Sequence, residues 1–285
     1  MKNFFKATGK AILYFAVYII VQLVISFTYG IVWTIIKIME LTASGQEPDN
    51  MLLTQQLTEQ LLNDTMMLTF LTGAITLLIY WISFAIRKKK FLKEVEIKAI
   101  SVKEIWAIVV AGLSLNVIIS VVLSVIPWPQ EWLEAYVTSA GTIDNSVLAW
   151  VTTVIMAPIL EEILFRGLIY TRLKKGMPAL VAALVASLVF GIMHGTIIWA
   201  LYAFVIGMVM TWIFERYQSL TANILFHMAF NTMGMIISMI PEETEFMIWI
   251  LFAVGVVAMI FACRHILRYN VPINNIGEEQ NEETN

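Results

Sequence analysis

The sequence predicts an all-α fold, a polytopic membrane bundle of about eight transmembrane helices with both termini in the cytoplasm. Three observations predict it. First, 59% of the 285 residues are hydrophobic and only 14% are charged, whereas about a quarter of a soluble domain is charged. Second, apolar runs long enough to cross about 30 Å of hydrocarbon recur along the chain. Third, basic residues gather in every second connection between these runs.

The composition excludes several classes of protein. With a mean hydropathy of +0.80, the chain has too few charges to cover a soluble surface, which rules out soluble enzymes, disordered proteins and secreted disulfide scaffolds. Cys263 is the only cysteine, so the chain has no intramolecular disulfide and no cysteine zinc cluster. We find no Gly-rich phosphate loop and no nucleic-acid motif. The Arg87–Lys90 run beside a membrane helix is typical of a topology signal that also attracts anionic lipid, so we expect the lipid bilayer, and not nucleic acid, as a partner.

Each span is predicted to be a helix, because backbone amides in lipid must be paired within their own segment. The predicted spans cover about residues 11–39, 66–86, 104–126, 146–170, two short helices within 178–214, 219–240 and 246–262. The stretch 178–214 is too long for one helix, and Gly195 and Trp199 near its middle predict a tight outer turn. The first run is too long for a cleaved signal peptide, so we expect it to be retained.

Lysine and arginine predict the orientation of the bundle. They occupy the N-terminal tail and alternate connections, at Lys2, Lys6, Lys10, Arg87–Lys90, Lys93, Lys98, Lys103, Arg172, Lys174, Lys175, Arg216, Arg264 and Arg268. The other connections hold none, and three of them are acidic, including those at 46–64 and 128–144. We therefore predict a multi-pass protein of the cell membrane, in a bacterial plasma membrane, with these acidic connections outside.

Ionisable groups inside a bilayer are costly and indicate a functional site. Three predicted spans carry such groups or amides: Glu161, Glu162 and Arg166 in the fourth, His194 in the fifth, and Asn223, His227 and Asn231 in the seventh. Counting from the turn of each hairpin at 1.5 Å per residue puts Glu162 and His194 at depths that differ by about 5 Å. The same count gives His227 and Asn231 similar depths, so we expect these side chains to converge on one layer.

Helix geometry separates the two glutamates. Glu162 and Arg166 are four residues apart and share a face, with the acid in the favourable N-terminal position. Glu161 is rotated from Glu162 by about 100°. We therefore predict that Glu162 is neutralised structurally by Arg166 and that Glu161 has a chemical role. Pro158, just upstream, removes one helical hydrogen bond and is expected to bend the helix.

The seventh span carries a polar stripe with two interpretations. Interhelical hydrogen bonding is a common role for Asn and His in membrane bundles, and for Asn223 alone it is the favoured one. His227 with Asn231, opposite His194 and Glu161, instead favours a site. Phe190 lies one turn before His194 and could be a substrate-side wall or core packing. Phe190 and Asn223 are the candidate substrate-binding residues.

These residues resemble the CPBP family of intramembrane proteases, which includes the eukaryotic CAAX prenyl protease 2 and many bacterial immunity-associated (ABI family) proteins. The family pattern is Glu-Glu-x-x-x-Arg, then Phe-x-x-x-His, then His-x-x-x-Asn. It is matched by Glu161, Glu162, Arg166, Phe190, His194, His227 and Asn231. Each motif alone is weak, but all three in order on three membrane helices are specific, and the resemblance covers about residues 145–240.

The resemblance implies hydrolysis of a peptide bond in a membrane cavity open to the cytoplasm. By resemblance, Glu161 would activate water, His194 and His227 would position it or bind a metal, and Asn231 would stabilise the oxyanion. An amide and an imidazole can donate hydrogen bonds to a developing oxyanion. The implied substrate is a hydrophobic or lipid-modified peptide, or a membrane protein.

The cofactor stays open in the sequence. Zinc held by His194, His227 and Glu161, with an open position for water, is one alternative. However, the chain has no His-Glu-x-x-His motif, and the three residues lie on three different predicted helices. The family has been described both as metalloproteases and as metal-independent glutamate proteases. We favour the metal-independent version, because no sequence spacing enforces a ligand pair.

The sequence thus predicts four segments. Residues 1–144 form the first three helices with their loops, 145–240 the catalytic core of helices four to seven, 241–270 the last helix, and 271–285 an acidic polar tail that is expected to be disordered. A non-catalytic bacteriocin-immunity or scaffold protein with the same fold is the alternative to the protease. A proton-coupled transporter is a third interpretation, but the chain lacks the inverted repeat often seen in such folds.

Overall fold

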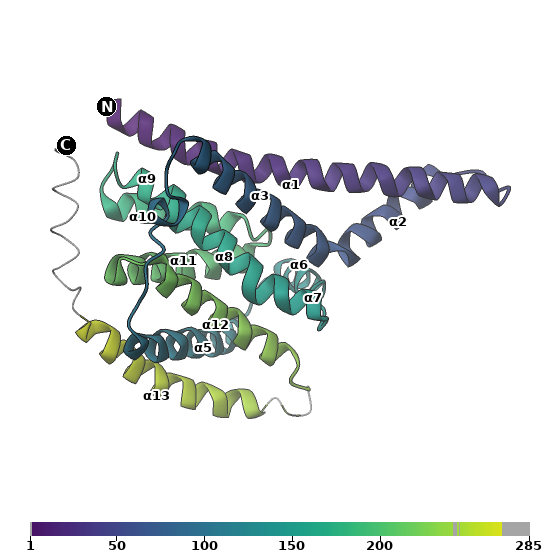
Figure 1. The fold of residues 1–285 in the computed structure, drawn as a ribbon. Coiled ribbons are helices and arrows are strands. Elements are labelled where there is room, and N and C mark those ends of the chain that lie inside the picture. Colours follow the sequence, from purple (N-terminus) through teal and green to yellow (C-terminus); the bar gives the residue numbers. More distant parts are fainter. Residues whose placement is uncertain (1, 242–243, 245, 270–285) are drawn as a thin grey trace. The chain divides into compact units, whose positions relative to one another are not determined.

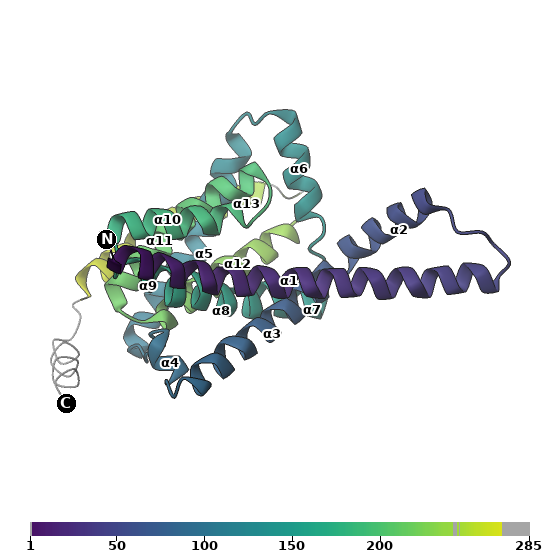
Figure 2. The same ribbon diagram turned by 90° about the horizontal axis from the view of Figure 1, so that it is seen from above.

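The computed structural model describes residues 2–241, 244 and 246–269 and confirms a polytopic helical bundle (Figures 1 and 2). Within these residues, seven helical segments are long and apolar enough to cross a membrane. They are α1 (Lys2–Ala43), α3 (Thr65–Ile86), α5 (Val102–Val125), the segment Val147–Leu173, α11 (Ile197–Tyr217), α12 (Leu220–Ser238) and α13 (Phe246–Arg268). The predicted polar tail lies outside the described residues. The orientation in the membrane stays a prediction.

The predicted division of the stretch 178–214 into two helices is confirmed, with one difference. α10 (Ala179–Ile192) is followed by a turn and by α11, and Gly195 in that turn has a φ of +83°, which favours glycine. α10 has 14 residues and is therefore only about 21 Å long. His194 consequently lies in the turn beyond α10, whereas the sequence predicted it within the helix.

Two compact units make up the chain, Met1–Val95 with Val125–Met208, and Glu96–Ser124 with Val209–Asn285. We call them unit 1 and unit 2. The division cuts the predicted core 145–240 inside α11. In unit 1, α1 packs along α3 and along the C-terminal half of the segment Val147–Leu173 (Figure 1).

The hairpin of α10 and α11 depends on a close approach of its two helices. A Cβ atom added to Gly191 would lie 2.6 Å from the carbonyl oxygen of Ala200, and one added to Gly207 would lie 2.9 Å from the Cβ of Ser187. Small residues at helix interfaces allow such packing in membranes, where no hydrophobic force drives helices together. The hairpin brings Gly207 near the fourth predicted span, where it contributes to the site described below.

Unit 2 is held at one end by a polar cluster. The Tyr217 hydroxyl donates a hydrogen bond to Oε2 of Glu104 at 3.1 Å, and Nε2 of His265 lies 3.1 Å from the same oxygen. The cluster ties together the ends of α11, α5 and α13. Along α5 the packing is tight, since a Cβ at Gly112 would lie 2.4 Å from the carbonyl oxygen of Phe226 on α12.

Three helices lie in the connections that hydropathy marks only as loops. They are α2 (Asn50–Asn63), α4 (Phe91–Glu94) and α6 (Gln130–Ala140). Asp49 caps α2 by accepting hydrogen bonds from the amides of Met51 and Leu52, which stabilises a helix start. α2 folds back beside the C-terminal half of α1 (Figure 2).

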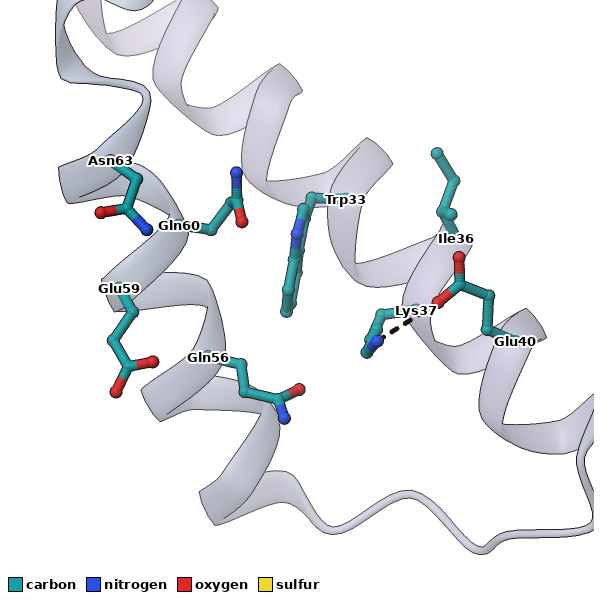
Figure 3. A pocket seen from close by; sticks show the side chains of 8 residues that line it. All are labelled: Trp33, Ile36, Lys37, Glu40, Gln56, Glu59, Gln60 and Asn63. Atoms are coloured by element: carbon teal, nitrogen blue, oxygen red, sulfur yellow. Dashed lines mark hydrogen bonds and ion pairs between the residues drawn. The ribbon is translucent and has the colours of Figure 1, made fainter.

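A polar groove of about 390 Å³ separates α1 from α2 (Figure 3). Trp33 of α1 points toward α2, and the amides of Gln56 and Gln60 face it. Lys37 pairs with Glu40 at 3.2 Å, and both side chains come from α1. None of the predicted site residues lines this groove, so it is separate from the candidate site.

Candidate active site

The fourth predicted span carries the glutamates on an irregular helix. It consists of α7 (Val147–Trp150), η1 (Val151–Met156), α8 (Ala157–Glu162), η2 (Ile163–Tyr170) and α9 (Thr171–Leu173), where η1 and η2 are π-helical. Pro158 lies in the first turn of α8 and cannot donate the hydrogen bond of a regular helix. π-Helical turns occur frequently at functional sites, and here they flank α8, which ends in Glu161 and Glu162.

Glu162 and Arg166 form the buried ion pair that their spacing predicts. Nη1 of Arg166 lies 2.8 Å from Oε1 of Glu162, and the two side chains are 1% and 0% exposed. Taking two charges out of water costs several kcal/mol per ion, and mutual attraction offsets this only with good geometry. The pair is therefore a structural element whose two members depend on each other.

The guanidinium of Arg166 also joins three helices. Nη2 donates a hydrogen bond to the carbonyl oxygen of Gly207 on α11 at 3.0 Å, and Cζ lies 4.6 Å from the centre of the Phe190 ring on α10. A cation over an aromatic face contributes about 2 kcal/mol when desolvated. Through these contacts, Arg166 fixes η2 against the α10–α11 hairpin.

Glu161 differs from its neighbour in its surroundings. It is partly exposed, whereas Glu162 is fully buried. The charge of Glu161 acts on Arg166 and on the hydroxyl of Tyr18, a residue of α1. The carboxylate is thus near enough to interact electrostatically with the buried cation and with a polar group of the first helix. The sequence did not indicate Tyr18, because one tyrosine in a long apolar run gives no signal.

His194 is oriented by the end of α10. Its Nδ1 lies 2.8 Å from the carbonyl oxygen of Phe190, and a carbonyl only accepts, so Nδ1 carries the hydrogen. In the neutral ring, Nε2 then holds the lone pair. The His194 ring also packs against Phe190, with 4.8 Å between ring centres. The predicted one-turn relation between these two residues is confirmed.

Phe190 is a packing residue in this arrangement. It is 2% exposed and lies between Arg166, His194 and Phe165, whose ring centre is 5.1 Å away. Its contacts hold the cation and the imidazole in place. Its predicted role as a substrate-binding residue stays a prediction.

α12 in unit 2 carries the remaining predicted residues. Asn223 is fully buried, and its amide donates a hydrogen bond to the carbonyl oxygen of Met210 on α11 at 2.7 Å. This contact has the interhelical character expected for Asn223, and a substrate-binding role stays a prediction. His227 is 5% exposed and Asn231 is partly exposed. The spacing of four residues puts these two side chains on one face of α12.

The predicted residues thus form two groups, one in each unit. Glu161, Glu162, Arg166, Phe190 and His194 come together in unit 1. His227 and Asn231 share a face in unit 2. Their convergence on one layer stays a prediction. Gly207 and Tyr18 are the residues that sequence reasoning missed. Gly207 accepts a hydrogen bond from Arg166, and Tyr18 is affected by the charge of Glu161, so both interactions join segments far apart in the chain.

The predicted zinc ligands come from both units of the chain. Among the described residues, no group of three or more His, Cys, Asp or Glu side chains could hold a metal ion. His194 has the arrangement common to metal-bound histidines, one ring nitrogen hydrogen-bonded to a carbonyl, but a single such residue is not a site. Zinc binding by His194, His227 and Glu161 stays a prediction, because His227 belongs to the other unit, and no chemical step below is routed through a metal.

Comparison with known proteins gives one family. Residues 143–233 match the model of a family described as Type II CAAX prenyl endopeptidase Rce1-like. The match contains every predicted site residue and supports the resemblance to CAAX proteases. No curated protein and no solved structure matches the chain.

The two glutamates should respond differently to the same substitution. Glu162→Gln leaves Arg166 buried without its carboxylate, and we expect the free energy of unfolding to fall by about 3 kcal/mol. Glu161→Gln changes a partly exposed group that does not form this pair, so the loss should stay below about 1 kcal/mol. Thermal unfolding of both variants in the same detergent measures the difference. Equal losses would contradict the assignment of the buried pair.

Proposed function

We propose that this chain is an intramembrane endopeptidase that hydrolyses a peptide bond with Glu161 as the base. Its residues 143–233 match the CAAX protease family. The proposed substrate is a hydrophobic, lipid-modified peptide or a membrane protein, and the proposed location is a bacterial plasma membrane. One observation carries the proposal. A fully buried glutamate is paired with arginine, while the adjacent glutamate is partly exposed, and a histidine of the same unit is oriented by a backbone carbonyl.

In the proposed reaction, Glu161 activates water. The ionised carboxylate accepts one proton as the water oxygen bonds to the carbonyl carbon of the substrate, which forms a tetrahedral oxyanion. Glu161 then gives that proton to the amide nitrogen as the C–N bond breaks, leaving a carboxyl group and an amine. General base catalysis of this kind contributes about 10² to 10⁴-fold. The partial exposure of Glu161 supports this role, because water must reach the base.

His194 is proposed to orient the attacking water. The hydrogen bond between Nδ1 and Phe190 fixes the ring and leaves Nε2 as the acceptor in the neutral form. A hydrogen bond from water to Nε2 would direct the other proton of that water toward Glu161. This role needs a fixed ring plane, which the contact with Phe190 provides.

His227 and Asn231 are proposed to stabilise the oxyanion. An amide N–H and an imidazole N–H are suitable donors to the negative oxygen of a tetrahedral intermediate. Both residues share one face of α12, and Asn231 is partly exposed.

The direct test is the peptide content of membranes. Cells that carry the wild-type protein and cells that carry Glu161→Gln are compared by mass spectrometry of membrane peptides. We expect specific cleavage products in the wild type to fall by at least about 100-fold in the variant, as for the loss of a general base. Glu59→Gln, which changes an exposed glutamate of α2, is the matched control and should leave the products unchanged.

Identical membrane peptides in wild type and Glu161→Gln would contradict the protease. They would favour the alternative, a bacteriocin-immunity or scaffold protein that keeps the fold without catalysis.

Metal dependence has its own test. We expect active, purified protein to hold far less than one zinc per chain and to keep its activity in chelator, because the proposed steps use only side chains of this protein. Elemental analysis of an active preparation, repeated on His194→Ala and His227→Ala, measures this. One zinc per chain that is lost with either histidine would show that the metal-independent version is wrong.

A further inference from the structure

A basic pocket lies at one end of unit 1, away from the glutamates. It is a cavity of about 470 Å³ between the first turns of α1, the end of α3, the loop that follows α3, and the end of the fourth span at α9. Figure 1 shows the N-terminus of α1 and α9 at this same end. The cations that line the pocket are Lys6, Lys10, Arg87, Lys89, Arg172 and Lys175. The sequence predicts this end to be cytoplasmic.

Among the described residues that line the pocket, Glu94 supplies the only carboxylate, and one negative charge does not neutralise six cations. Oε1 of Glu94 lies 2.7 Å from Nζ of Lys89, and Oε2 lies 2.9 Å from Nη2 of Arg172. Partial burial raises the pKa of the Glu94 carboxyl, but the interactions with Lys89 and Arg172 outweigh it and lower that pKa overall. The charge of Glu94 is thus paired with Lys89 and Arg172. The pocket remains strongly positive because of the four remaining cations, Lys6, Lys10, Arg87 and Lys175.

These four cations line the pocket and are exposed. Lys6 and Lys10 lie one turn apart on the same face of α1, and both are exposed, as is Lys175. Arg87 is fixed by a hydrogen bond from its Nε to the carbonyl oxygen of Ser83 at 2.8 Å. Three flexible ammonium groups and one fixed guanidinium therefore surround a space suited to an anion with several oxygen atoms.

The inner wall of the pocket is apolar. It is formed by Ala7, Tyr14 and Phe84, all buried. Next in sequence to the lining residues Lys6 and Arg87, the apolar side chains of Phe5 and Ile86 are 69% and 77% exposed, as expected where helices meet acyl chains. A free phosphate ion would use only the cations, whereas a phospholipid would use the cations and the apolar surface together.

We propose that this pocket binds the headgroup of an anionic phospholipid from the cytoplasmic leaflet. Lys6, Lys10 and Lys175 donate to the phosphate oxygens, and the glycerol and the first acyl carbons pack against Tyr14 and Phe84. Basic pockets between transmembrane helices on the cytoplasmic side bind anionic headgroups in this way. The proposal does not rest on the proposed peptidase activity.

Binding here would act on helices that reach the candidate site. The carbonyl oxygen of Tyr14 accepts a hydrogen bond from the Tyr80 hydroxyl at 2.7 Å, which ties α1 to α3. One turn further along α1 is Tyr18, on which the charge of Glu161 acts. A lipid that joins α1, α3 and α9 stabilises the folded unit, because a ligand that binds only the native state raises its stability.

The experiment measures lipid retention by native mass spectrometry of the full chain in detergent. Phosphatidylglycerol and phosphatidylcholine are titrated onto the wild type and onto the double variant Lys10→Gln/Lys175→Gln. We expect the wild type to retain phosphatidylglycerol over phosphatidylcholine and the variant to bind phosphatidylglycerol at least about 10-fold more weakly, given the contribution of each basic residue near anionic lipid. Thermal unfolding without lipid should be the same for both proteins, since both substituted side chains are exposed.

Lys90→Gln/Lys103→Gln is the matched control, because it removes two exposed lysines that do not line the pocket. It should retain phosphatidylglycerol like the wild type. Equal retention by the pocket variant, or equal loss in the control, would overturn the proposal. Displacement of the lipid by inorganic phosphate at millimolar concentration would also overturn it, because the site would then bind a free anion.

Discussion

The buried pair of Glu162 and Arg166 is the interaction on which the candidate site depends. A charge in a membrane bundle is stable only with a partner, and this pair meets that constraint within a single helical turn. The arginine then reaches beyond its own helix to the Gly207 carbonyl and the Phe190 ring. One cation therefore fixes the relative positions of η2, α10 and α11. Every unit 1 side chain that the sequence predicted for the site belongs to these elements or to the adjoining α8 and turn.

This arrangement explains how adjacent glutamates can have different roles. Glu162 is committed to the pair and has no exposed surface. Glu161 lies on another face of the helix and remains partly exposed, and its carboxylate interacts with the positive charge of Arg166. Phe190 connects Arg166 to His194, because its ring packs on the guanidinium of Arg166 and its carbonyl oxygen accepts the hydrogen bond from Nδ1 of His194. The histidine is thus positioned indirectly by the ion pair.

Much of the fold and part of the site could be predicted from local sequence. Hydropathy located the long helices, and the spacing of four residues identified the Glu162–Arg166 pair before any contact was known. The π-helical turns, the position of His194 beyond α10, and the contact of Arg166 with Gly207 could not be predicted, because they depend on packing between segments far apart in the chain. Short helices such as α2 were not predicted, because their sequences are not continuous apolar runs. The basic pocket is a further example, since the sequence indicated a topology signal that also attracts anionic lipid but did not bring these lysines and arginines together in one cavity.

A double-mutant cycle on the ion pair tests this account most directly. The free energies of unfolding of Glu162→Gln, Arg166→Met and the double variant are measured in the same detergent. If the pair supports the site as described, each single variant leaves one buried group stranded, and the double variant should lose about 2 kcal/mol less than the sum of the two single losses. Losses that add to within about 0.5 kcal/mol would show that the two side chains act independently, which would contradict the central role of the pair.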